Sequence, residues 1–280
     1  MKYMILIFIL FGSASAFGQD MKEIEAKLVS VFHKYDEWND KRVDFRDKDD
    51  FDSMGICYDS MHTAEASFTN LLLYYTSKYP TTLQYDFKEL RKVRIGVLTS
   101  SDKKFRIYCW LEKDHGTMIE ITNIFQFESG GKVYSEYINP YQTEDPAESD
   151  EEPDLTDYDS IYSLSLGNRT IYIGEWSAIE DGSDFGAGFN FFEVKDSVLD
   201  TELPIIKQGK HLKSSISTWY RPTEDYVDIT KCVKAGKILK IRRGNRMGVL
   251  SKKYDVYWFN GKYYDKVRVK KKPKSKVKTK

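Results

Sequence analysis

The stretch Phe105–Leu111, FRIYCWL, decides the fold class of this chain. Phe105, Ile107 and Cys109 occupy every second position, which places these three side chains on one face of a β-strand. The same two-residue period recurs from residue 93 onward. It predicts strands at 105–111, 118–127, 133–138, 161–166, 170–176, 189–194, 216–220, 238–241, 247–250, 254–259 and 263–269.

Short turn segments separate these strands, and no helix-length periodic segment lies between them. The turns are expected at 101–102, 129–131, 167–168, 243–245 and 260–261. The last of these, Asn260-Gly261, is a strong signal for a two-residue hairpin loop. Strands joined directly by turns pair antiparallel, because parallel pairing requires a long crossover connection.

Two helices are predicted before the strands. Apolar residues recur at three- and four-residue steps between residues 24 and 38 and again between residues 61 and 79, where Pro80 ends the pattern. The charged stretch at 44–52, DFRDKDDFD, is expected to form the loop that joins them. Each helix has an apolar stripe that needs a partner, so we expect the helical pair to pack on the sheet.

The expected fold is therefore α+β, with an N-terminal helical pair packed against a larger antiparallel β-meander. Its sheets are expected to resemble a sandwich or part of a propeller. Three strands end in aromatic clusters around Trp110, Trp176 and Trp258, at intervals of 66 and 82 residues. Intervals this unequal do not make a regular repeat, so a closed propeller is the second interpretation.

These patterns divide the chain into four regions. Residues 1–18 are expected to be a signal peptide and residues 19–92 a helical region. Residues 93–269 are expected to form the β domain, which includes an acidic loop at 143–159. Residues 270–280 are expected to be a disordered basic tail.

The first sixteen residues are typical of a secretory signal peptide. Lys2 precedes the unbroken apolar run YMILIFILF, and the small residues GSASA follow it, as cleavage requires. The run is too short to span a bilayer, and no cysteine follows it for a lipid anchor. The mature protein is expected to begin between Phe17 and Asp20 and to be exported, periplasmic or extracellular, with no transmembrane segment.

The three cysteines are an odd number in an oxidising compartment. Cys109 is expected to be a buried, inert thiol because it shares a strand face with Phe105 and Ile107. Cys57 and Cys232 are then the one pair that a disulfide bond could join.

The net charge is zero, but the charges are separated along the chain. Residues 231–280 carry 19 Lys and Arg against two acids, whereas residues 143–159 carry nine acids and no base. Pro146 and Pro153 exclude regular structure from this acidic segment, which indicates a solvated loop. The segment from Lys270 to Lys280 has almost no apolar side chains to bury, so we expect it to be disordered.

Three roles are open for this basic tail. It is a solvated extension, or it attracts an anionic cell-surface polymer such as lipopolysaccharide phosphate or a teichoic-like chain, or it folds back on the acidic loop. Nucleic acid is not expected as a partner, because the chain is predicted to be exported. The tail also lacks interleaved aromatic side chains for base stacking.

Residues 92–137 resemble a segment of uncharacterised secreted proteins of Bacteroidota. In those proteins a TSSDGKFRIYSW strand is followed by a GGTMHFF strand and by an FQY…KVYS strand. Residues 99–110, 116–119 and 125–135 match, whereas Cys109 and Glu120-Ile121 depart from the pattern. The resemblance implies an exported, β-rich protein and assigns no catalytic residue.

The most site-like segment is 180–190, EDGSDFGAGFN. Its glycines would let the backbone approach a ligand, while acidic and amide oxygens and aromatic rings would contact a sugar. The ligand-binding candidates are Trp176, Asp181, Asp184, Phe185 and Asn190. The alternative is a wide hairpin loop in which glycine serves turn geometry and the aromatic side chains cap the core.

A second aromatic segment is Trp219-Tyr220-Arg221-Pro222. It either forms a cation–π ledge for a ligand or ends a strand with its aromatic side chains packed inward.

No motif of known chemistry is present. The four histidines are far apart in sequence, and no G-x-S-x-G elbow, phosphate loop or calcium-loop spacing occurs in the mature chain. We therefore expect no catalytic residue, no metal and no cofactor. The leading hypothesis is an exported, non-catalytic protein that binds a protein or glycan through loops of the β region. The alternative is a hydrolase acting on carbohydrate or cell-wall material, with its acids between Glu175 and Glu193.

Overall fold

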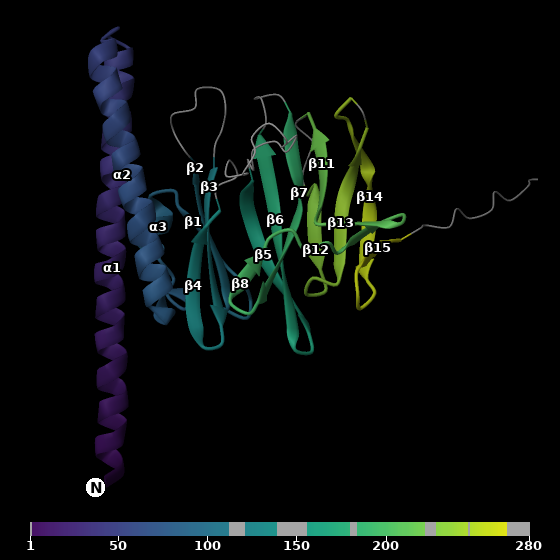
Figure 1. Ribbon diagram of the computed structural model, residues 1–280, viewed down its shortest axis with the longest axis horizontal. Helices are drawn as coiled ribbons and strands as arrows, with labels where there is room; N and C mark the ends of the chain where they lie inside the picture. Colours follow the sequence, from purple (N-terminus) through teal and green to yellow (C-terminus); the bar gives the residue numbers. More distant parts are fainter. Residues whose placement is uncertain are drawn as a thin grey trace, which may run out of the picture.

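A computed structural model describes residues 2–111, 121–138, 156–179, 184–221, 228–245 and 247–267, with side chains from residue 21 onward. It confirms the α+β fold class. The molecule is a stack of four layers, a helical hairpin followed by three β-sheets in the order in which the chain forms them (Figure 1). No helix among the described residues is long and apolar enough to cross a membrane.

The helical layer consists of α1 (Lys2–Arg46) and α2 (Phe51–Lys78), followed by the short helices η1 (Pro80–Leu83) and α3 (Lys88–Lys92). Pro80 follows the end of α2, as its position in the sequence predicts. The helix α1 includes the predicted signal peptide, whose removal stays a prediction.

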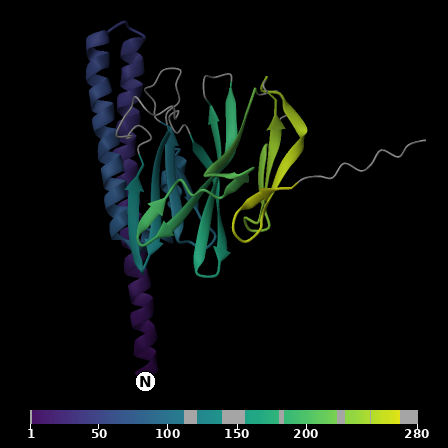
Figure 2. The ribbon, with the colours of Figure 1, turned by 45° about the vertical axis from the view of Figure 1, so that its right-hand side comes forward.

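The loop predicted at 44–52 is shorter than expected, since α1 continues to Arg46 and α2 already begins at Phe51. The Asp50 side chain caps α2 by accepting a hydrogen bond from the Ser53 amide at 3.2 Å. Figures 1 and 2 show that this end of the hairpin extends beyond the strands of the adjacent sheet. The apolar pattern weakens there because no sheet covers the helices, although the helices themselves continue.

Sheet 1 is a meander of four strands in the order β1-β2-β3-β4. Its strands are β1 (Gly96–Thr99), β2 (Phe105–Leu111), β3 (Ile121–Ser129) and β4 (Lys132–Tyr137). Sheet 2 has the order β11-β7-β6-β5, and β8 pairs with β7 outside this path. Its strands are β5 (Asp157–Leu166), β6 (Arg169–Ile179), β7 (Phe185–Lys195), β8 (Val198–Asp200) and β11 (Ser215–Tyr220).

Sheet 3 has the order β10-β9-β15-β14-β13-β12. Its strands are β9 (Ile206–Gln208), β10 (His211–Lys213), β12 (Thr230–Val233), β13 (Ile238–Gly244), β14 (Leu250–Phe259) and β15 (Tyr264–Lys266). Every described strand pair is antiparallel except β9 with β15, which are parallel. The three tryptophan-containing segments lie on β2, β6 and β14, each an inner strand of its sheet.

The strand boundaries correct the sequence prediction in several places. The predicted strands at 247–250 and 254–259 belong to one strand, β14, which begins at Leu250. Five strands of three or four residues, β1, β8, β9, β10 and β12, were missed because so short a segment shows no period. The acidic loop predicted to reach residue 159 ends earlier, since β5 begins at Asp157 and Tyr158 is buried. Residues 139–155 and the predicted tail lie outside the described residues.

Each pair of neighbouring layers encloses its own apolar cluster. Between the helices and sheet 1 the cluster includes Leu28, Phe32, Phe68, Leu72, Tyr108 and Trp110. Between sheets 1 and 2 it includes Phe105, Ile107, Phe125, Tyr158, Tyr172 and Phe192. Between sheets 2 and 3 it includes Ile173, Phe189, Phe191, Leu239, Tyr257 and Tyr264. Successive residues of β2 thus face different layers, which is why six of its seven residues are buried.

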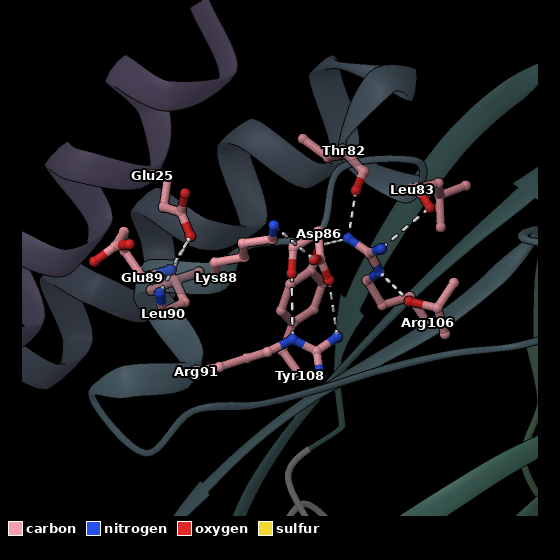
Figure 3. Close-up of polar contacts among 11 residues, drawn as sticks. Glu25, Thr82, Leu83, Asp86, Lys88, Glu89, Leu90, Arg91, Arg106 and Tyr108 are labelled. Atoms are coloured by element: carbon pink, nitrogen blue, oxygen red, sulfur yellow. Dashed lines mark hydrogen bonds and ion pairs between the residues drawn. The ribbon is translucent and has the colours of Figure 1, made fainter. Parts of the chain in front are cut away.

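A buried carboxylate ties α1 to the short helix α3 (Figure 3). Glu25 accepts hydrogen bonds from the backbone amides of Glu89 at 2.7 Å and Leu90 at 3.2 Å, and from the Tyr85 hydroxyl at 2.8 Å. These amides are orphan donors at the start of a helix, so the carboxylate satisfies groups that would otherwise be buried without a partner.

A buried arginine makes the corresponding link from sheet 1 (Figure 3). Arg106 of β2 donates to the carbonyl oxygens of Thr82 and Leu83 in η1 and to the Thr99 hydroxyl. Both buried charges are therefore bonded within the fold, and they position the helices on the sheet.

The cysteines correct one prediction and confirm another. Cys57 and Cys232 do not form a disulfide bond, because they lie in α2 and β12, near opposite ends of the stack (Figure 1). Cys109 is buried, as predicted. Burial, with the nearby Asp157 carboxylate, raises the pKa of its thiol well above the ordinary range.

Candidate functional site

The segment 180–190 is not a loop along its whole length, because strand β7 begins at Phe185. Gly186 pairs with Ala178 of β6 and Trp219 of β11, and the alternate residue Gly188 pairs with Trp176 and Ser217. Asp181 lies outside the described residues.

The two glycines of this strand make room for indole rings. A Cβ atom on Gly186 would lie 2.8 Å from the Trp219 ring and 3.1 Å from the Trp176 ring. On Gly188 it would lie 2.8 Å from Trp176 and 2.4 Å from the carbonyl oxygen of Ile216. Both glycines lie inside a regular strand, so they serve close packing and not turn geometry.

Trp176 and Asn190 are brought together as an internal pair. The Trp176 indole donates a hydrogen bond to Asn190 Oδ1 at 3.2 Å, and Asn190 Nδ2 donates to the Tyr158 hydroxyl at 3.0 Å. Trp176 is only 7% exposed. These two predicted site residues therefore support the sheet from within and offer little surface to a ligand.

Trp219 is the exposed member of the aromatic pair. Its ring centroid lies 6.4 Å from that of Trp176, at an interplanar angle of 59°, and the residue is 38% exposed. Because Gly186 has no side chain, the Trp219 ring packs directly against the backbone of β7. The indole is thus supported from below by backbone and by a second, buried indole.

An ion pair lies beside this ring. Arg221 follows Trp219 by two residues, so the two side chains leave the chain on the same side. The Arg221 guanidinium contacts the Asp184 carboxylate at 3.1 Å, and both groups are partly exposed. The Arg221 amide also donates to the Gly248 carbonyl at 2.9 Å, which fixes the end of β11.

Phe185 does not belong to this group. It lies on the other side of the strand, where its ring packs on that of Tyr220 at 6.0 Å, near Ala187 and Leu250. Tyr220 is buried while Trp219 is exposed, so one of the two aromatic side chains packs inward, and the cation–π ledge for a ligand stays a prediction.

We call Trp219, Arg221 and Asp184, with Trp176 beneath them, the tryptophan ledge. It joins two segments that are separate in the sequence, because β7 and β11 are paired neighbours in sheet 2. A partly exposed indole near a guanidinium and a carboxylate on the same side of the sheet suits a ligand with an apolar face and polar edges, such as a sugar ring.

Among the described acids considered for a hydrolase, Glu175 and Glu193 have other partners. Glu175 accepts hydrogen bonds from the hydroxyls of Tyr162 at 2.7 Å and Thr230 at 2.5 Å. Glu193 is buried and contacts Arg169 at 2.5 Å and Lys195 at 3.2 Å. Each carboxylate thus contacts a hydroxyl or a cation.

Asp159 lies near Glu175. Burial raises the pKa of Asp159, and the Asp157 and Glu175 carboxylates raise it further, against a hydrogen bond with Ser177 that lowers it. Among the described residues, no group of three or more His, Cys, Asp or Glu side chains is arranged to hold a metal ion.

Comparison of the chain with protein-family models, with curated proteins and with solved structures found no match.

Proposed function

We propose that this protein is an exported, non-catalytic carbohydrate-binding protein that holds a sugar ring on the tryptophan ledge. The observation that carries the proposal is the exposed Trp219 ring, which lies against Gly186 and the buried Trp176. A ring held in this way loses little conformational freedom when a ligand stacks on it, so more of the interaction energy appears as affinity.

The polar groups of the ledge provide orientation. The Arg221 guanidinium has five N–H donors, and its contact with the Asp184 carboxylate uses only some of them, so donors remain for sugar hydroxyls. Stacking on the indole and hydrogen bonds at the ring edge address different parts of the same sugar. These interactions suit a site that binds a sugar without catalysing a reaction.

Isothermal titration calorimetry with three neutral oligosaccharides, chitohexaose, cellohexaose and xylohexaose, tests this proposal. We expect at least one of them to bind the full chain and to bind W219A about tenfold more weakly, a loss of about 1.4 kcal/mol. Trp258 provides the control, because it is also exposed but lies in β14 of sheet 3. W258A should bind as the unmodified chain does, and equal binding by W219A would contradict the proposal.

The hydrolase remains the second candidate, motivated by the proximity of Asp159 to Glu175. A glycosidase needs two carboxylates on either side of the scissile bond, one of them free to exchange a proton. The two hydroxyl donors on Glu175 oppose this role. Release of reducing ends from the same oligosaccharides, abolished by E175Q, would favour the enzyme.

A further inference from the structure

A groove of about 530 Å³ opens between the edge strand β11 of sheet 2 and the inner face of sheet 3. A second groove of the same volume adjoins it and shares Gln208, Tyr257 and Lys266. Both lie where the apolar cluster between the two sheets ends. They are independent of the tryptophan ledge, because Trp219 lines neither of them.

Four strands of sheet 3 become polar at the same end. Along most of each strand, the side chains that face sheet 2 are apolar. At this end, the side chains that face sheet 2 are instead polar: Arg243 in β13, Asp255 in β14, Lys266 in β15 and Gln208 in β9. The strands β13 and β15 run antiparallel to β14, and β9 runs parallel to β15. These four residues therefore meet at one end of the sheet, although they come from distant parts of the sequence.

Asp255 holds the two cations of this polar end in place. One of its carboxylate oxygens contacts the Arg243 guanidinium and the other contacts the Lys266 ammonium. Asp255 is 15% exposed at its side chain, whereas Arg243 and Lys266 are 51% and 47% exposed. The carboxylate is thus mostly buried beneath two exposed cationic groups.

One carboxylate cannot neutralise two cations, and each cation retains unused donors. A guanidinium has five N–H groups and an ammonium has three. Lys213, which is exposed, adds a further positive charge at the groove, and Thr218 of β11 adds a hydroxyl. Donors that an internal acid already orients lose little freedom on binding, which favours an anionic ligand.

We propose that this groove, which we call the cationic groove and define by Lys213, Arg243, Asp255 and Lys266, binds a linear chain bearing repeated phosphate groups. Guanidinium, ammonium and hydroxyl donors from several strands match a tetrahedral anion with oxygens on several sides. The adjoining groove, where Lys207 lies 4.0 Å from the Asp265 carboxylate, extends the site beyond the size of a single phosphate.

Titration of the full chain with inorganic polyphosphate tests the proposal. We expect R243Q/K266Q to bind polyphosphate at least about tenfold more weakly, and the slope of log affinity against log salt to fall by about two. The matched control is K88Q/R91Q in α3, because Lys88 and Arg91 also share one acid, Asp86, as Figure 3 shows. This control also removes two positive charges, but far from the groove. It should therefore leave the affinity for polyphosphate within about twofold of that of the unmodified chain.

A second variant keeps the proposal testable if R243Q/K266Q fails to fold. D255N removes the competing negative charge and retains one oxygen that can accept from one of the two cations, so it should bind polyphosphate more tightly. Weaker binding by folded D255N would overturn the proposal, as would equal weakening by K88Q/R91Q or unchanged binding by R243Q/K266Q. Equally tight binding of orthophosphate would overturn the requirement for a chain, and equally tight binding of polyglutamate would overturn the choice of phosphate.

Discussion

The Glu25 carboxylate accepts a hydrogen bond from the backbone amide of Glu89 at 2.7 Å, across 64 residues of sequence. The contact joins the N-terminal helix to the segment that leads into the first strand. It is buried, since Glu25 is 3% exposed. The position of the helical layer on sheet 1 thus depends on one acidic side chain as well as on apolar packing.

Replacing Glu25 with alanine should lower the free energy of unfolding by about 3 kcal/mol, because two backbone amides and one hydroxyl would lose their buried acceptor. Chemical denaturation followed by circular dichroism measures the change. Glu23 lies in the same helix but is exposed, so E23A should change stability by less than about 0.5 kcal/mol. Equal effects from the two variants would show that the Glu25 contacts contribute nothing specific.

Replacing Gly188 with alanine should destabilise the protein by about 2 kcal/mol, since the new Cβ atom would meet the Ile216 carbonyl oxygen at 2.4 Å. The Gly188 backbone lies in β7, an inner strand that is paired on both sides, so it cannot move aside easily. The control is G55A in α2, where nothing lies within 4 Å and alanine should stabilise the helix by up to about 1 kcal/mol. Thermal unfolding should therefore shift in opposite directions for the two variants.

All three cysteines should titrate as free thiols once the protein is unfolded without reductant. In the folded protein at pH 8 they should react slowly with Ellman's reagent. Cys57 and Cys109 are buried, and burial raises the pKa of Cys232 to about 12. A count of one thiol after unfolding would show that Cys57 and Cys232 are joined by a disulfide bond.

Stability should fall between pH 10 and about pH 12, partly because of Tyr85. Burial and the Glu25 carboxylate raise the pKa of Tyr85 to about 12, above the value near 10 expected in the unfolded chain. The folded state therefore holds this proton more tightly. Its stabilising contribution is complete below pH 10 and is lost as the pH rises through the folded pKa. Urea unfolding at several pH values should show a shallower decline for Y85F, and identical slopes would contradict this assignment.

Export should leave a mature N-terminus between Phe17 and Asp20, because the small residues before it match the requirement for signal cleavage. N-terminal sequencing of the protein recovered from a secreting host measures this directly. A chain that retains Met1 in that fraction would contradict the signal-peptide prediction and, with it, the exported location we propose.

The kinds of elements in this protein can be predicted from the order of its residues. The two-residue period identifies β2 with its exact bounds, and the helical period identifies the parts of α1 and α2 that lie against sheet 1. Both patterns arise because one side of each element is covered by other apolar groups. The prediction was wrong where that cover is missing, as at the tip of the helical hairpin, and where strands are too short to show a period.

How the elements face one another follows from their packing in three dimensions. Whether Gly186 and Gly188 shape a turn or receive indole rings depends on the pairing of β7 with β6, which carries Trp176, and with β11, which carries Trp219. The cationic groove likewise forms only because four neighbouring strands of sheet 3 carry polar residues at the same end of the sheet. Periodicity records which side of an element is covered, but it does not record which element covers it. Strand pairing and layer stacking supply that information through contacts between residues far apart in sequence.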